Sequence, residues 1–126
     1  MDFVAFLESK AGMTSSFALP FTLPGPNPGS KTWRISFWAA QRWQPGSIPE
    51  VAQQAIRLTA TFATPGGPVS SMVFHDTIRD EVFRKYASRP FMLPANAAAT
   101  ITLLFEGTRE EAAWHMAFLD LVEVRE

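Results

Sequence analysis

The sequence contains no cysteine and only one tyrosine among its 126 residues. The absence of cysteine excludes disulfide bonds, thiolate zinc sites and a cysteine nucleophile, but it identifies no compartment, since secreted domains can also lack cysteine. No apolar run reaches the roughly 20 residues of a membrane-spanning helix, and no basic segment precedes an N-terminal apolar stretch as in a signal peptide. The formal net charge is −1, so no general attraction to nucleic acid or to anionic membrane is expected.

The chain is rich in proline and aromatic residues, with ten prolines, eleven phenylalanines and four tryptophans. Hydrophobic residues make up 47% and charged residues 18%, as in a folded globular protein. Proline and glycine gather in short breaks at residues 23–30, 44–49, 64–68 and 93–97. The segments between these breaks have the length of strands, so we expect one all-β domain over residues 1–126.

Alternation of apolar and other side chains assigns the faces of these strands. In residues 32–43, TWRISFWAAQRW, alternate residues from Trp33 are predicted to face the core, and those from Arg34 the outside. The inward residues predicted in this and two later segments are Trp33, Ile35, Phe37, Ala39, Ile56, Leu58, Ala60, Phe62, Ile101, Leu103 and Phe105. The last segment, residues 117–124, is apolar on both sides, which favours a strand that is central or covered on both faces.

Three segments have helical features within this β pattern, at residues 47–56, 77–89 and 108–119. The first and third begin with capping boxes, in which Ser or Thr is followed three residues later by Glu. Propensity alone predicts helix for all three segments. Short helical turns in the loops would reconcile them with an all-β domain.

Four stretches of the chain occur in a recognisable order. They are VAFLE followed by GMTSSFALP, then WRISFWAAQR, then ATITLLFEGT and finally AFLDLVEV. Together they resemble the jelly-roll carbohydrate-binding modules of the galactose-binding-like group. The resemblance implies a β-sandwich of two antiparallel sheets that binds a polysaccharide without transforming it. It also implies a secreted protein in which the module is covalently attached to a glycoside hydrolase, with a plant cell-wall β-glucan such as cellulose as the first expected ligand.

Two elements of the family are missing from this chain. Family members usually begin with a further strand, and their closing strand commonly carries Asp-Asp, where this sequence has Asp120-Leu121. These elements often help to bind a structural calcium ion in that family, so we expect no required cofactor and leave a structural calcium ion open. Asp120 is the residue that the resemblance would offer to a calcium ion.

Sugar recognition requires a flat apolar surface for the ring and planar polar groups for its hydroxyls. The outward side of the 32–43 segment supplies both, and the next segment contributes an arginine that would share this face. The candidate binding residues are Trp38, Arg34, Arg42, Gln41, Trp43, Arg57, Trp114 and His115. The structural alternative for Trp38 is packing beneath a loop, with the arginines paired to carboxylates. Trp43 is either a second stacking platform or a cap on the sandwich end, while Trp114 and His115 lie either in the core or at the ligand.

Catalysis is not expected. The sequence has no G-x-S-x-G, P-loop or dinucleotide-binding motif, and no pair of carboxylates is identified that a glycosidase would hold across a cleft. The two histidines lack the spacing of a transition-metal site. The rival function is a structural or protein-interaction β-sandwich module of a larger secreted or surface protein, in which the outward tryptophan and arginine residues form a protein interface.

Overall fold

The structure, a computed structural model, describes residues 5–10, 13–24, 28–42, 54–80, 82–94, 97–107 and 115–126. Its strands are β1 (Ala5–Lys10), β2 (Met13–Thr14), β3 (Ser16–Thr22), β4 (Arg34–Arg42), β5 (Gln54–Thr64), β6 (Gly67–Ile78), β7 (Arg84–Ala87), β8 (Thr100–Gly107) and β9 (His115–Arg125). One 3-10 turn, η1 (Pro28–Ser30), precedes β4. Within these residues no helix is long and apolar enough to span a membrane.

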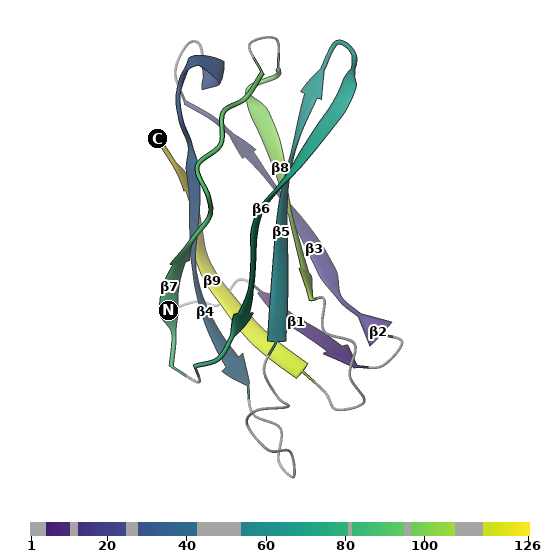
Figure 1. Ribbon diagram of the computed structural model, residues 1–126, viewed down its shortest axis with the longest axis vertical. Helices are drawn as coiled ribbons and strands as arrows, with labels where there is room; N and C mark the ends of the chain where they lie inside the picture. Colours follow the sequence, from purple (N-terminus) through teal and green to yellow (C-terminus); the bar gives the residue numbers. More distant parts are fainter. Residues whose placement is uncertain are drawn as a thin grey trace.

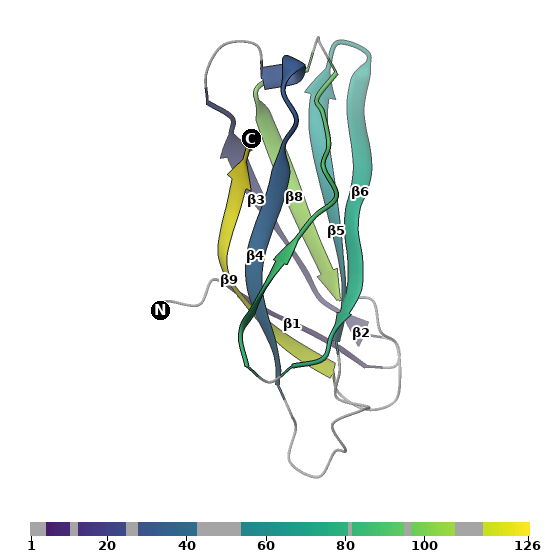
Figure 2. The same ribbon diagram turned by 60° about the vertical axis from the view of Figure 1, so that its left-hand side comes forward.

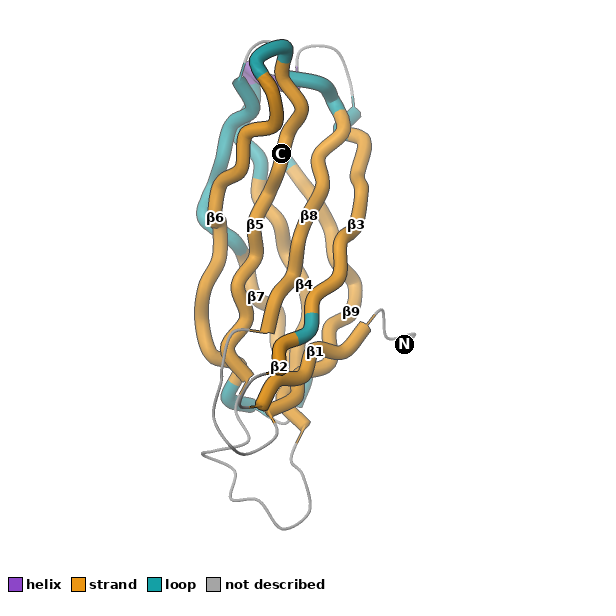
Figure 3. The backbone as a smooth tube through the Cα atoms, turned by 90° about the vertical axis from the view of Figure 1, so that its right-hand side faces the viewer, coloured by secondary structure: helices purple, strands orange, loops and turns teal. Residues whose placement is uncertain are grey.

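The strands form two antiparallel sheets packed face to face (Figure 1). The five-stranded sheet has the order β2-β1-β9-β4-β7, and the four-stranded sheet has the order β3-β8-β5-β6. In Figure 3, strands β6, β5, β8 and β3 of the four-stranded sheet lie in front of β7, β4 and β9 of the five-stranded sheet. The expected all-β sandwich of two antiparallel sheets is therefore confirmed.

The core lies between the sheets and is built from the residues that alternation directs inward. Every one of the eleven predicted inward residues is at most 3% exposed, including Trp33 at 1%. Phe37 is at the centre, with its ring 5.1 Å from that of Phe74, 5.4 Å from Phe105 and 5.7 Å from Tyr86. These contacts join β4 to three other strands, two of them in the opposite sheet, so Phe37 helps to hold the two sheets together.

A β-bulge explains the mixed apolar pattern of β9. Ser36 of β4 pairs with Glu123 whereas Trp38 pairs with Asp120, so Leu121 and Val122 together face one residue of β4. Leu121 is the extra residue, with a φ of 48° and a side chain 48% exposed. Val122 therefore packs against the core. Coverage on both sides was the wrong explanation for this pattern, but β9 does lie at the centre of its sheet.

The helical predictions are wrong wherever the structure describes those segments. Residues 77–89 contain the end of β6 and the whole of β7, residues 54–56 open β5, and residues 115–119 open β9. Ladder pairing with β4 outweighs the local preference at β7, because Tyr86 lies opposite Phe37 and packs against it. Residues 47–53 and 108–114 lie outside the described residues. The GMTSSFALP stretch also divides, since β2 pairs with β1 and β3 pairs with β8.

Candidate functional site

Strand β4 carries Trp38 on the outward face of the five-stranded sheet. Its inward neighbours Phe37 and Ala39 are 0% exposed, whereas Arg34 is exposed and the Trp38 side chain is half-buried. Among the described residues no ring contact joins Trp38 to another aromatic side chain. An indole that keeps part of its surface in water is available for stacking against a ligand.

Register places a cation and a carboxylate on either side of this indole. Trp38 lies opposite Lys85 of β7 and opposite Asp120 of β9, and residues that are directly opposite in a sheet share a face. We call this surface the Trp38 face. Its residues are Arg34, Ser36, Trp38, Lys85, Asp120, Glu123 and Arg125.

The polar groups of the Trp38 face differ in their availability. Lys85 and Arg34 are exposed, and Arg125 forms an ion pair of 2.6 Å with Glu123. Asp120 is only 1% exposed; its Oδ1 accepts a hydrogen bond of 2.8 Å from the Leu121 backbone N–H. The other oxygen, Oδ2, is buried and has no hydrogen-bond partner among the described residues. A carboxylate oxygen left in this state is costly unless a donor reaches it.

Asp120 is the residue that the family resemblance offers to a calcium ion. No cluster of three or more histidine, cysteine, aspartate or glutamate side chains that could hold a metal occurs in the described ranges. A calcium ion needs about six to eight oxygen ligands, and calcium binding at Asp120 stays a prediction.

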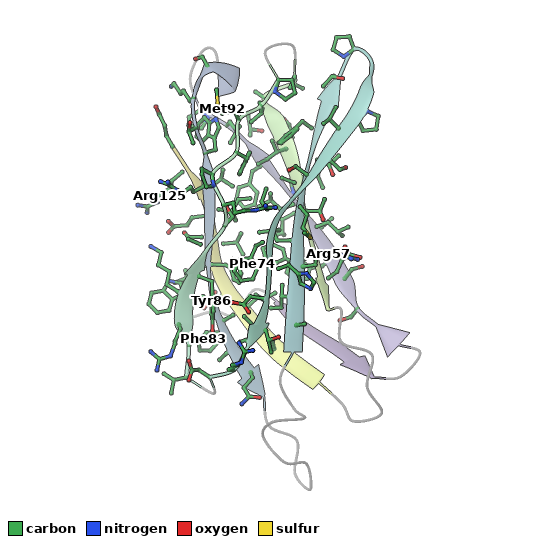
Figure 4. All side chains as sticks on the ribbon, viewed as in Figure 1. Arg57, Phe74, Phe83, Tyr86, Met92 and Arg125 are labelled. Atoms are coloured by element: carbon green, nitrogen blue, oxygen red, sulfur yellow. The ribbon has the colours of Figure 1, made fainter. Side chains whose placement is uncertain are left out.

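Two candidate residues do not share the Trp38 face. Gln41 points inward with an exposure of 5%, and its amide nitrogen donates a 3.0 Å hydrogen bond to the Arg79 carbonyl. Arg57 lies on the opposite side of the sandwich, because β5 follows β4 in the sequence but belongs to the other sheet. The expectation that Arg57 would join the face of Trp38 is therefore wrong. In Figure 4, Arg57 and Arg125 lie on opposite sides of the molecule.

Arg57 is engaged in an ion pair on its own sheet. Its Nε donates to Glu106 Oε1 at 3.1 Å, across the pairing of β5 with β8. This hydrogen bond, together with the charge of Glu106, raises the pKa of Arg57 above its ordinary value. The carboxylate thus occupies one of the donors that a ligand would need.

The four remaining candidates lie at or next to the ends of β4 and β9 in the sequence. Trp43 and Trp114 lie outside the described residues, while Arg42 and His115 end and begin strands whose backbones are described there. Lys85, in contrast, was missed by the sequence reasoning because its segment was assigned to a helix. Phe83 and Tyr86 are half-buried and Arg84 and Lys85 are exposed, a pattern without the alternation of a strand, so the sequence carried no period-two signal there.

Comparison with known proteins identifies the fold. No protein-family model matches the sequence, and no curated protein matches it. Among solved structures, the chain is similar to the xylanase 10B of Clostridium thermocellum, in a structure of its CBM22-1 and GH10 modules complexed with xylohexaose. The TM-score is 0.56 and the identity 12%, over 78% of this chain and 17% of that one.

A second similar structure is a family 16 carbohydrate-binding module, with a TM-score of 0.54 and an identity of 9% over 94% of this chain and 74% of that one. At these identities the likeness concerns the fold. The chain has the jelly-roll β-sandwich fold of carbohydrate-binding modules, as the order of its sequence segments indicated.

Proposed function

We propose that the chain is a non-catalytic carbohydrate-binding module that holds a polysaccharide on the Trp38 face. The observation that carries this proposal is the half-buried Trp38 indole, which lies in register between Lys85 and the buried carboxylate of Asp120. The fold supports it, because both similar structures contain carbohydrate-binding modules.

The proposed mechanism combines stacking with hydrogen bonding. The C–H face of a sugar ring packs on Trp38, and hydroxyl groups accept hydrogen bonds from Lys85 and Arg34. Arg42, Trp43, Trp114 and His115 remain predicted contributors at the ends of β4 and β9.

The wider role follows from the weak affinity expected of a shallow site. Covalent attachment to a glycoside hydrolase in a secreted protein would raise the effective concentration of substrate at the enzyme. Plant cell-wall β-glucan is the ligand first expected, and xylan is the second, since one similar structure contains xylohexaose.

Affinity gel electrophoresis in soluble β-glucan or xylan tests the proposal. The wild-type chain should be retarded by at least one of the two, and Trp38→Ala should abolish the retardation. Met92→Ala is the matched control, because it removes an apolar side chain that is 57% exposed and lies outside the Trp38 face. Circular dichroism on each variant verifies the fold.

Either of two results would contradict the proposal. One is that neither polysaccharide nor a wider set of soluble plant and bacterial glycans retards the wild-type chain. The other is that Trp38→Ala changes only the oligomeric state in sedimentation, which identifies a protein interface in a structural or interaction module.

A further inference from the structure

A cavity of about 370 Å³ opens on the edge of the sandwich, away from the outward side of Trp38. Its walls come from residues 72–76 of β6 and from Ala87 and Arg89, at the end of β7 and beyond it. Strand β6 is the edge of the four-stranded sheet and β7 is the edge of the five-stranded sheet. The cavity is therefore formed where the two sheets meet, and Figure 2 shows the chain after β7 running between β4 and β6.

Hydrogen bonds to both sheets hold Ser88 and Arg89, the residues directly after β7, in place. The Arg89 backbone N–H donates to the Val73 carbonyl at 2.8 Å, and the Arg89 guanidinium donates to the Met72 carbonyl. On the other side, the Ser88 backbone N–H donates to the Ile35 carbonyl at 2.7 Å. The cavity wall is thus held in place before any ligand arrives, which reduces the entropic cost of binding.

A second β-bulge forms the floor of the cavity. Leu58 of β5 pairs with Phe74 and Thr59 pairs with Met72, so Val73 is an extra residue in β6. Val73 is 2% exposed and the adjacent Phe74 is half-buried, so both consecutive side chains pack toward the interior. The Phe74 ring is 6.0 Å from that of Tyr86, and Figure 4 shows the two side chains between the sheets. The floor is apolar and partly aromatic.

The rim is polar and carries charges of both signs. His75, Asp76 and Arg89 are exposed, and Asp76 Oδ1 accepts a 2.7 Å hydrogen bond from the Thr77 backbone N–H. A guanidinium group has five N–H donors, so Arg89 keeps donors beyond those used for Met72. The negative charge of the Asp76 carboxylate disfavours the binding of phosphate or another anion in this cavity. An apolar floor below mixed donors and acceptors matches a neutral ring that carries hydroxyl groups.

We propose that this cavity is a second carbohydrate site, which takes a single sugar residue or the end of a chain. Its volume is near the lower limit of the roughly 300–1,000 Å³ of small-molecule pockets, which suits one short ligand and not an extended chain. The inference rests on the proposed function, because it assumes that the chain meets carbohydrate. It assigns the sandwich edge a role distinct from that of the Trp38 face.

Amide chemical-shift mapping of the full chain by NMR tests this site. Xylose, glucose, mannose, galactose and xylohexaose serve as separate probes. At least one of them should shift the backbone amides of Val73, His75 and Arg89. Asp76→Ala should raise the dissociation constant for that sugar several-fold, because Asp76, opposite the buried Ile56, shares the inner face of β6 with Phe74, whereas His75 lies opposite Arg57 on the outer face.

The controls separate this site from the Trp38 face. Ser70→Ala alters β6 outside the cavity and should leave the dissociation constant unchanged, as should Trp38→Ala. Asp76→Asn keeps the size of the side chain and provides a milder variant should Asp76→Ala fold poorly. The inference is overturned if no probe shifts the cavity amides, or if the shifts persist at the same sugar concentration in Asp76→Ala.

The two proposals fail in different ways. If xylohexaose or β-glucan shifts only amides near Ser36 and Lys85, the Trp38 face holds and the cavity proposal is wrong. If a sugar shifts only the cavity amides and no polysaccharide is retarded in gels, the assignment of the Trp38 face is wrong.

Discussion

Replacing Trp33 and Trp38 in turn separates folding from ligand binding, since Trp33, directly before β4, is buried in the core and Trp38 of β4 faces outward. Trp33 is 1% exposed, and its backbone exchanges hydrogen bonds of 2.8 and 2.9 Å with Phe91. A buried tryptophan removes about 150–250 Å² from water. At about 25 cal/mol per Å² this corresponds to roughly 4–6 kcal/mol. Because a domain is stable by only about 5–15 kcal/mol, Trp33→Ala could unfold the protein.

Phenylalanine is therefore the informative substitution. Trp33→Phe retains most of the buried area, so we expect a loss of about 1–2 kcal/mol in the free energy of unfolding, from the smaller ring and the cavity left behind. Trp38→Phe should cost less, under about 1 kcal/mol, because the indole that it replaces faces outward and is partly hydrated. Urea denaturation followed by circular dichroism measures both values.

Binding should show the opposite order. We expect Trp33→Phe to leave glycan affinity within about twofold of wild type and Trp38→Phe to weaken it several-fold, because only Trp38 contacts the proposed ligand. Affinity gels in the retarding polysaccharide measure this difference. The reasoning is refuted if Trp33→Phe weakens binding without loss of stability, or if Trp38→Phe destabilises the fold more than Trp33→Phe does.

Three further predictions follow from single contacts. Arg57→Ala should cost less than about 1 kcal/mol of unfolding free energy, since the ion pair with Glu106 is partly hydrated. The retardation of this variant in polysaccharide gels should equal that of the wild type. A loss of retardation would show that Arg57 belongs to the binding site. Burial, followed by the charge of Asp80, raises the pKa of Tyr86 above its ordinary value of 10.0. Stability that is fully present below pH 10.0 should therefore fall as the pH rises toward the folded-state pKa. Tyr86→Phe should flatten this fall in thermal melts, and ultraviolet absorbance of the only tyrosine gives the pKa directly; an ordinary pKa would contradict the assignment. Leu121→Gly should change the unfolding free energy by less than about 1 kcal/mol, because relief of the left-handed backbone offsets the lost side-chain contacts. Urea denaturation measures this change in the unfolding free energy. A loss above about 2 kcal/mol would show that the contacts of the Leu121 side chain stabilise the fold by more than its left-handed backbone conformation destabilises it.

Alternation predicted the faces of the strands but not the sheet to which each strand belongs. Ile56 and Phe62 were placed correctly in the core because a period of two depends only on the strand itself. Arg57 was assigned to the wrong side of the molecule because the crossover from β4 to β5 depends on how the strands pair across the whole chain. Lys85 was missed for a related reason, since pairing with β4 determines its strand more than local propensity does.

The two β-bulges could not be predicted from the alternation of side chains either. Leu121 and Val73 each add one residue to a strand, and each changes which later residues face inward. A pattern with period two cannot distinguish such an insertion from a strand that is apolar on both sides. The cavity on the sandwich edge depends on one of these bulges, so no motif in the sequence indicated it.

The bulge in β9 affects how the outer surface of this sheet can change during evolution. Ala117 and Leu119 face the core before Leu121, and Val122 and Val124 pack against it afterwards. Loss of the single codon for Leu121 would leave an uninterrupted alternation with the same four residues inward. A lineage of such domains can thus reshape the surface beside the indole by gaining or losing one residue, without a compensating substitution in the core.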